Sequence, residues 1–372
     1  MLITNATAYL NGRFYEHMSV RAEGGAVTQV DSALQPRPDE ETLDLGGDYL
    51  LPGFVDVHIH AYMGMDTMSG EEAVRHMSRE LKKGGVAAFL PTTMSASLQD
   101  TKAALFGINA VMKRPEPQGA QVTGAHMEAP FLSAHRCGAQ IAAHFIPPSM
   151  EAWLEMTGEF ASAVRIITLA PELAGAESWI RKIASQGIVV SIGHSDATCE
   201  QTHLAADWGA THVTHLFNAQ TPLNHREPGI PGAALADGRL YAEIIGDGIH
   251  LHPDILRLAI RAKGREKTVL ITDAMEAAGM PEGTYQLGGQ AVYVKNGAAR
   301  LITGTLAGST LTMAKGLQNL INIGIAPEDA VFVTTQSPAD SIGEKLLGRI
   351  TAGSPALFTR WDKGWNMVSV LG

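Results

Sequence analysis

The chain has 372 residues, of which 45% are hydrophobic, and its formal net charge is −10 without long acidic or basic runs. This balance predicts a globular protein with a sizeable core and argues against broad nucleic-acid binding. Because Cys137 and Cys199 are the only cysteines and no apolar run approaches ~18 residues, we expect a cytoplasmic protein without a disulfide framework or a membrane span.

The first 50 residues are predicted to form short β-strands. Segments 2–10, 13–22, 26–34 and 41–51 are separated by Gly, Asn, Asp and Pro turns and have no helical period. The chain returns to this pattern after residue 350, in segments 356–361 and 366–372. Since the C-terminal piece is too short to fold alone, we expect residues 1–50 and 350–372 to form one small β-sandwich domain.

Between these ends, residues 51–349 alternate apolar strands with amphipathic helices. We place strands near 53–60, 86–93, 121–128, 165–172, 188–195, 211–218, 241–247 and 268–273. This alternation predicts parallel βαβ units, and eight of them close a (β/α)8 TIM-like barrel. The segment 283–305, which follows the eighth strand, is predicted to be a β-hairpin insertion.

The first barrel strand ends in the sequence "LPGFVDVHIH", residues 51–60. Side chains alternate along a strand, so Asp56, His58 and His60 share one face. Two imidazoles that converge from one strand offer two nitrogen ligands to a metal. Two histidines spaced in this way, without further ligands, are more often hydrogen-bonded core residues. A metal site therefore requires ligands from elsewhere in the chain.

Such partners stand at the C-terminal ends of other predicted strands, where the chemistry of this fold is located. The candidate metal ligands are His58, His60, Glu128, His194, His215 and Asp273. Each has an ordinary explanation alone, but their shared position predicts one site. Of the other histidines, we expect His17, His76 and His203 on the surface, His126 in the core or beside the ligands, and His212 in a structural role.

Histidine and carboxylate ligands without cysteine suit Zn²⁺, Fe²⁺, Mn²⁺ or Co²⁺, one or two per subunit, rather than a closed structural zinc. Such an ion lowers the pKa of a bound water from about 16 to about 7. A carboxylate such as Asp273 then takes the remaining proton and passes it to a leaving amine. The set predicts hydrolysis of an amide or a related C–N bond.

Two loops carry candidate substrate contacts. In the loop after the sixth strand, 215–235, Arg226 is a lone cation whose forked donors suit phosphate or carboxylate, or a surface ion pair with Glu227. The segment 304–321 puts small residues before a helix. The backbone N–H groups near Leu306 and Ala307 either contact a ligand or only allow close packing.

The motifs "LPGFVDVHIH", "HMEAPF", "SIGHSDA", "THLFNAQTP", "HREPGIPG", "DGIHLHP", "ITDAM" and "GTLAGS" resemble those of the N-acetylglucosamine-6-phosphate deacetylases of the amidohydrolase superfamily. The resemblance runs from about residue 50 to 345. It implies metal-dependent release of acetate from N-acetylglucosamine 6-phosphate, leaving glucosamine 6-phosphate. By motif match, Glu128, His194 and His215 hold the principal metal, and Asp273 is the general base and then the acid. His58 and His60 imply a second metal position.

The resemblance also implies substrate contacts. The side chain of Asn218 and the backbone of Ala219 contact the sugar phosphate, and His250 contacts the sugar or the acetamide. Arg226 holds the phosphate and can reach into a neighbouring subunit, which implies a homodimer. Gln140 stands where many relatives have a histidine near the substrate carbonyl, and it can donate a hydrogen bond but carries no charge.

Other functions remain open on the sequence alone. One is a different amidohydrolase reaction, such as deacetylation of N-acetylgalactosamine 6-phosphate or another N-acyl amino sugar, or hydrolysis of a cyclic amide. Another is a non-catalytic sugar-phosphate sensor on the same scaffold. A sensor has no use for Asp273, so the complete set of ligands and base favours an enzyme.

Overall fold

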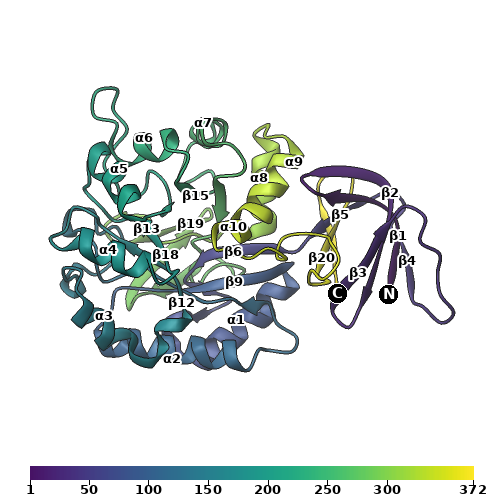
Figure 1. The fold of residues 1–372 in the computed structure, drawn as a ribbon, viewed down its shortest axis with the longest axis horizontal. Coiled ribbons are helices and arrows are strands. Elements are labelled where there is room, and N and C mark those ends of the chain that lie inside the picture. The colour runs from purple at the N-terminus through teal and green to yellow at the C-terminus, as the bar shows by residue number, and fades with distance from the viewer.

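The computed structural model describes residues 1–372 and has two parts, a barrel with helices around it and a smaller β domain that contains both termini (Figure 1). The barrel strands are parallel and follow chain order around the sheet. They are β6 (Phe54–Ile59), β9 (Val86–Thr93), β11 (Ala125–Met127), β12 (Val164–Leu169), β13 (Val189–Ile192), β14 (His212–Val213), β15 (Tyr241–Ile245) and β16 (Thr268–Ile271), with the short β10 (Gln121–Val122) beside β9. The predicted TIM-like barrel is confirmed.

Helices cover the outside of the barrel, as the connections between parallel strands require. The α-helices are α1 (Glu71–Lys83), α2 (Leu98–Lys113), α3 (Met150–Thr157), α4 (Ala176–Ala184), α5 (Cys199–Trp208), α6 (Gly229–Ala236), α7 (Pro253–Lys263), α8 (Met313–Asn322), α9 (Pro327–Thr334) and α10 (Gln336–Ser341). Short 3-10 turns lie at η1 (Thr67–Ser69), η2 (Ala134–Arg136), η3 (Ala142–His144) and η4 (Gly158–Ala163), and a two-stranded ribbon pairs β7 (Ala61–Tyr62) with β8 (Met65–Asp66).

A side chain closes the barrel between its first and last strands. Asp56 on β6 accepts hydrogen bonds from the hydroxyl of Thr272 at 2.5 Å and from its backbone N–H at 3.3 Å. Just above, the N–H of Asp273 donates to the carbonyl of His58 at 2.9 Å. The seam therefore fixes the two strand ends that carry His58 and Asp273.

The sixth strand is much shorter than the predicted 211–218. It ends at Val213, because the backbone turns into the left-handed region at His215 (φ 27°), Phe217 (φ 76°) and Ala219 (φ 49°). Left-handed residues at three alternate positions break the extended backbone that a continuing β-strand needs. The turn lifts His215 out of the strand and over the end of the barrel.

The small domain combines strands from both ends of the chain, as predicted. Its strands are β1 (Leu2–Leu10), β2 (Arg13–Glu23), β3 (Ala26–Asp31), β4 (Thr42–Asp44), β5 (Tyr49–Pro52), β20 (Phe358–Trp361) and β21 (Met367–Leu371). They belong to one mixed sheet in the order β21-β20-β5-β1-β2-β3, with β4 beside β1. The antiparallel pairing of Phe358 with Pro52 and of Trp361 with Tyr49 joins the two ends.

The insertion after β16 has three strands, so the predicted hairpin was one strand short. They are β17 (Gly283–Leu287), β18 (Gln290–Lys295) and β19 (Ala298–Leu301), all antiparallel. Both turns have two residues with positive φ, Gly288–Gly289 and Asn296–Gly297, which is the geometry of tight hairpin turns. The Asn-Gly sequence of the second turn was the overlooked signal for the third strand.

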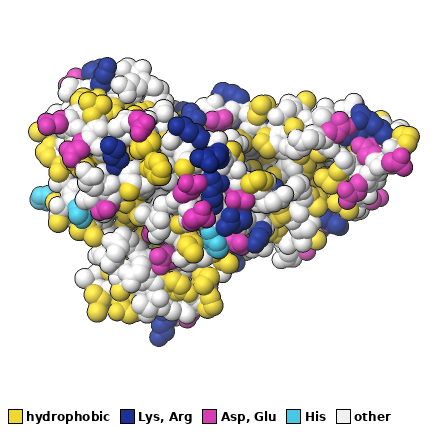
Figure 2. All heavy atoms as spheres, turned by 90° about the horizontal axis from the view of Figure 1, so that it is seen from below, with side chains coloured by type: hydrophobic (Ala, Val, Ile, Leu, Met, Phe, Trp, Pro, Cys, Tyr) yellow, Lys and Arg dark blue, Asp and Glu magenta, His cyan; other side chains and the backbone are white.

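Acidic and basic side chains are interspersed on the face seen in Figure 2. The same view shows the small domain as the narrower part of the molecule. Among the helices, none combines the length and the apolar character that a membrane crossing requires.

Candidate metal centre and active site

The six predicted ligands meet at the C-terminal end of the barrel. Each stands on or within two residues of a strand end, and each is at most 7% exposed. They come from five strands: His58 and His60 from β6, Glu128 after β11, His194 after β13, His215 after β14 and Asp273 after β16. The barrel therefore brings together side chains that are far apart in the sequence.

Glu128 lies at the centre of this group. Its Oε1 is 2.9 Å from Nε2 of His215 and 3.2 Å from Nε2 of His194. Its Oε2 is 3.2 Å from Nε2 of His60, and Oε1 is 3.4 Å from Nε2 of His58. One carboxylate thus contacts all four imidazoles.

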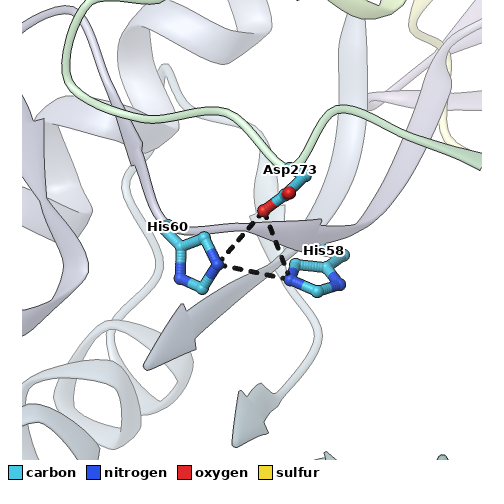
Figure 3. Close-up of side chains that lie close together, drawn as sticks. All are labelled: His58, His60 and Asp273. Carbon is cyan, nitrogen blue, oxygen red and sulfur yellow. Dashed lines mark hydrogen bonds and ion pairs between the residues drawn. The ribbon is translucent and has the colours of Figure 1, made fainter. Parts of the chain in front are cut away.

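Asp273 faces the two histidines of the first strand (Figure 3). Its Oδ1 lies 3.2 Å from Nε2 of His60 and 3.6 Å from Nε2 of His58, and these two nitrogens are 3.3 Å apart. The ligand atoms form two groups, His58–His60–Asp273 and Glu128–His194–His215. Glu128 is within reach of both groups.

Outer partners orient the rings. Nδ1 of His60 donates to the carbonyl of Thr92 at 3.3 Å, and Nδ1 of His194 donates to the carbonyl of Arg136 at 2.9 Å. Because a carbonyl can only accept, the proton of each neutral ring is on Nδ1 and the lone pair of Nε2 points into the site. This is the tautomer that binds a metal.

The backbone is strained at three of the ligands. His194 (φ 46°), His215 (φ 27°) and Asp273 (φ 48°) all have left-handed conformations that ordinary residues rarely adopt. Such strain concentrates at functional sites, where the surrounding structure holds it in place. Here each turn directs its side chain across the barrel end rather than along the strand.

The site attracts positive charge. Burial disfavours a charged imidazole at His60, yet hydrogen bonds to Asp273 and Glu128 raise its pKa to about 10. Burial is likewise outweighed at His215, where Glu128 raises the pKa to about 9. No lysine or arginine lines the cavity that opens onto these groups. Convergent nitrogen and oxygen donors in a buried, anionic cavity fit a divalent cation.

The cavity above the ligands has a volume of about 190 Å³. Among the predicted site residues, those that line it are His60, Glu128, Gln140, His194, His215, Asn218, Ala219, His250, Asp273 and Leu306. His58 is fully buried beneath them. Leu287 and Thr305, contributed by the insertion, form part of the wall.

Two predicted substrate contacts lie elsewhere. Arg226 is exposed on the loop that precedes α6, and the alternative ion pair between its guanidinium and Glu227 is not formed. Ala307 is fully buried in the apolar core beneath the insertion. Its N–H donates to the carbonyl of Ala299 at 3.1 Å and is not free for a ligand.

Gln140 holds Glu128. Its Oε1 accepts from the N–H of Ser95 at 2.7 Å, which fixes the orientation of the amide. Its Nε2 then donates to Oε2 of Glu128 at 2.5 Å and faces the sulfur of Met94 at 3.6 Å. In this arrangement both amide protons are directed to protein groups.

The five histidines that were predicted to lie outside the ligand set divide as follows. His126 is a satisfied core residue, with Nδ1 on the carbonyl of Val57 and Nε2 on the hydroxyl of Thr168. His212 is buried and stacks on Tyr241, and His17 is exposed. His203 is on the surface and pairs with Asp237. His76 differs from the surface prediction, because it is half-buried with Nε2 shielded from water.

Sequence reasoning missed Glu243, a fully buried carboxylate on β15 that contacts His58 and His215. The available signal was an acidic residue inside the apolar strand "YAEII". It also overlooked Met94, which separates the cavity from a neighbouring hollow on the insertion side. Its position after the second barrel strand was the only indication.

The model of the family described as "Amidohydrolase family" matches residues 49–370. The chain belongs to the amidohydrolase family. Its two groups of histidine and carboxylate ligands at the barrel end are thus those of an amidohydrolase, a hydrolase with a site able to bind metal.

Three proteins that are similar to this amidohydrolase are deacetylases of N-acetylated amino-sugar 6-phosphates. It is 37% identical to an N-acetylglucosamine-6-phosphate deacetylase of Lysinibacillus sphaericus, over 96% of this chain and 92% of the relative. It is 36% identical to an N-acetylgalactosamine-6-phosphate deacetylase of Escherichia coli O157:H7, over 92% and 90%. A crystallised mutant of the Mycobacterium smegmatis N-acetyl-D-glucosamine-6-phosphate deacetylase, in complex with N-acetyl-D-glucosamine-6-phosphate, superposes with a TM-score of 0.93 at 30% identity, over 100% of this chain and 97% of that one.

Proposed function

We propose that this amidohydrolase removes the acetyl group of an N-acetylated amino-sugar 6-phosphate, with N-acetylglucosamine 6-phosphate as the first candidate substrate. The products are acetate and glucosamine 6-phosphate. The observation that carries the proposal is the convergence of four imidazole Nε2 atoms on the Glu128 and Asp273 carboxylates in one buried cavity. The similar deacetylases support the choice of substrate class.

The two ligand groups would hold one or two divalent cations, chosen from Zn²⁺, Fe²⁺, Mn²⁺ and Co²⁺. Glu128, His194 and His215 form one group, and His58, His60 and Asp273 form the other. When bound, such a cation polarises a carbonyl and lowers the pKa of water. Because Nδ1 of His60 and Nδ1 of His194 are each held on a backbone carbonyl, Nε2 is the nitrogen of each ring that would bind a cation in place of a proton.

The protein's own groups supply the proton transfers. Asp273 is the carboxylate that lines the cavity at the end of β16, and it would accept a proton from the attacking water. It would then return that proton to the sugar nitrogen as the C–N bond breaks, so that the amine leaves neutral. Asn218, the backbone of Ala219 and His250 line the same cavity and would orient the sugar. Gln140 would keep Glu128 in place.

Arg226 would bind the 6-phosphate. Because it is exposed and does not line the cavity of its own chain, we propose that it acts in the site of a neighbouring subunit of a homodimer. A forked guanidinium suits the phosphate oxygens. The two free cysteines, Cys137 and Cys199, support a reducing cytoplasm as the compartment.

N-acetylgalactosamine 6-phosphate is the second candidate, favoured by the 36% identity to the deacetylase of that sugar. The test is acetate release from both phosphorylated epimers and from unphosphorylated N-acetylglucosamine, with metal content measured on the same sample. We expect turnover of one phosphorylated epimer that is lost on chelation and restored by added metal. A metal-loaded protein that is inert on all three sugars would contradict the proposal.

A further inference from the structure

Glu243 touches both ligand groups from beneath. It lies on β15 with its side chain fully buried. Its Oε2 accepts from Nδ1 of His58 at 3.0 Å and from the backbone N–H of His215 at 3.2 Å. One oxygen therefore links a residue of each group.

The contact with His58 sets the ring. A carboxylate accepts the proton of Nδ1, so the lone pair of Nε2 is directed toward His60 and Asp273. A carboxylate behind a histidine ligand also fixes the ring plane and increases the basicity of the other nitrogen. His58 has no carbonyl partner of the kind that His60 and His194 have, so Glu243 is its orienting group.

The contact with His215 holds a strained turn. Because β14 ends at Val213, the N–H of His215 has no partner in the strand ladder. A buried N–H without an acceptor is costly, and the carboxylate of Glu243 supplies one. The carbonyl of Glu243 also accepts from the N–H of Leu216 at 2.8 Å. The side chain and the backbone carbonyl of Glu243 thus both support the turn in which His215 has a φ of 27°.

A third cation site behind the ligands is a poorer explanation. His58, His126 and Glu243 do lie close enough together to be considered as one. However, Nδ1 of His126 donates to the carbonyl of Val57 at 3.0 Å, and its Nε2 accepts from the hydroxyl of Thr168 at 2.8 Å. With both nitrogens of His126 engaged, no three-ligand site remains.

We propose that Glu243 is a positioning residue that ties His58 to His215 and thereby sets the cation affinity of the site. The inference rests on the proposed metal-dependent function and assigns a role to a residue outside the ligand set. Glu243 does not line the cavity. It therefore acts through the ligands and not on the substrate.

The experiment measures Zn²⁺ affinity of metal-free protein by competition with a chromophoric chelator, alongside the free energy of unfolding. Glu243→Met removes both acceptor oxygens, and Glu243→Gln retains one without the charge. Thr168→Val is the matched control, since it removes a buried hydroxyl of the same barrel interior that bonds His126 and not a ligand. We expect a loss of about 10–100-fold in affinity for Glu243→Met, a smaller loss for Glu243→Gln and none for Thr168→Val.

An affinity of Glu243→Met within twofold of wild type would overturn the inference, and so would an equal loss in Thr168→Val. If Glu243→Met does not fold, an unchanged affinity in Glu243→Gln overturns it instead. Recovery of kcat in Glu243→Gln at saturating Zn²⁺ supports a positioning role. A wild type that binds Zn²⁺ but deacetylates none of the sugars contradicts only the proposed function, because the affinity comparison still decides the role of Glu243.

Discussion

The Nε2 atoms of His194 and His215 lie 3.1 Å apart, and both are within 3.2 Å of Oε1 of Glu128. The proton of the His194 ring is on Nδ1, where it meets the carbonyl of Arg136. Its Nε2 lone pair therefore faces the other imidazole and the carboxylate. Buried lone pairs and a carboxylate this close together are stable when a cation, either a proton or a metal ion, lies among them.

Metal removal should therefore destabilise the fold. A cation that binds only the folded chain adds about 4 kcal/mol to the free energy of unfolding when its free concentration is a thousand times Kd. Denaturant unfolding with and without Zn²⁺ or Mn²⁺ measures this difference. The double substitution His194→Ala/His215→Ala is the control and should respond much less. Equal responses of the two proteins would place the cation elsewhere.

Asp273→Asn should lower kcat by about 10²–10⁴-fold, the usual contribution of a positioned acid or base. Asparagine keeps the shape of the side chain and cannot accept the proton. Circular dichroism and thermal unfolding should remain close to wild type. Asp207→Asn on the exposed face of α5 is the control and should be fully active. A variant at 273 with normal turnover would exclude Asp273 as the base.

Arg226→Ala should raise KM for the phosphorylated sugar by about 10-fold or more, since a charged hydrogen bond contributes about 1.5–3 kcal/mol. KM for the unphosphorylated sugar should not change. Mixing this variant with Asp273→Asn tests the action across a dimer. Exchange of subunits should restore activity, because one site of each heterodimer then has both Asp273 and a partner's arginine. No recovery after demonstrated exchange would place the arginine in its own subunit's site.

The small domain should lose stability in acid through Glu40. Its carboxylate forms a two-pronged pair with Arg21 at 2.7 and 2.9 Å, and both side chains are at most 8% exposed. The hydrogen bonds from Arg21 lower the pKa of Glu40 to about 2. A lowered folded pKa means that the stabilisation is complete above the unfolded pKa of about 4.3 and is lost as the pH falls toward 2. The difference in unfolding free energy between wild type and Glu40→Gln should shrink over this window, and a constant difference would contradict the assignment.

Gly193→Ala should destabilise the protein by about 1–3 kcal/mol and weaken the site. A Cβ at this position would lie 2.7 Å from Cβ of Thr214 and 2.8 Å from Cγ2 of Thr168, so the strand that carries His194 must move. Gly238→Ala is the control, because a Cβ there meets nothing within 4 Å. Both free energies come from denaturant unfolding. Equal free energies of unfolding for the two variants would contradict this prediction, because they would show that the barrel interior accommodates the added methyl group.

Much of the site follows from strand periodicity. Alternation along β6 puts His58 and His60 on one face, and the parallel βαβ order puts Glu128, His194 and Asp273 at the same barrel end. The role of Glu243 does not follow, because one strand's pattern does not tell which residue it faces across the barrel. The early end of β14 was also missed, since the positive φ of His215 depends on an acceptor supplied by another strand. Local patterns predict elements and ends, whereas cross-barrel contacts decide which residues support them.

The seam between Asp56 and Thr272 joins residues 216 positions apart in the chain. During synthesis, the strand with His58 and His60 is complete long before the strand that leads to Asp273 exists. The barrel interior, with its buried carboxylates, can close only when that last strand arrives. Contacts of such long range slow folding, so the nascent chain must hold seven strands without their final neighbour. Cation binding at His58, His60 and Asp273 would then report a finished barrel, since a chain truncated before β16 lacks Asp273.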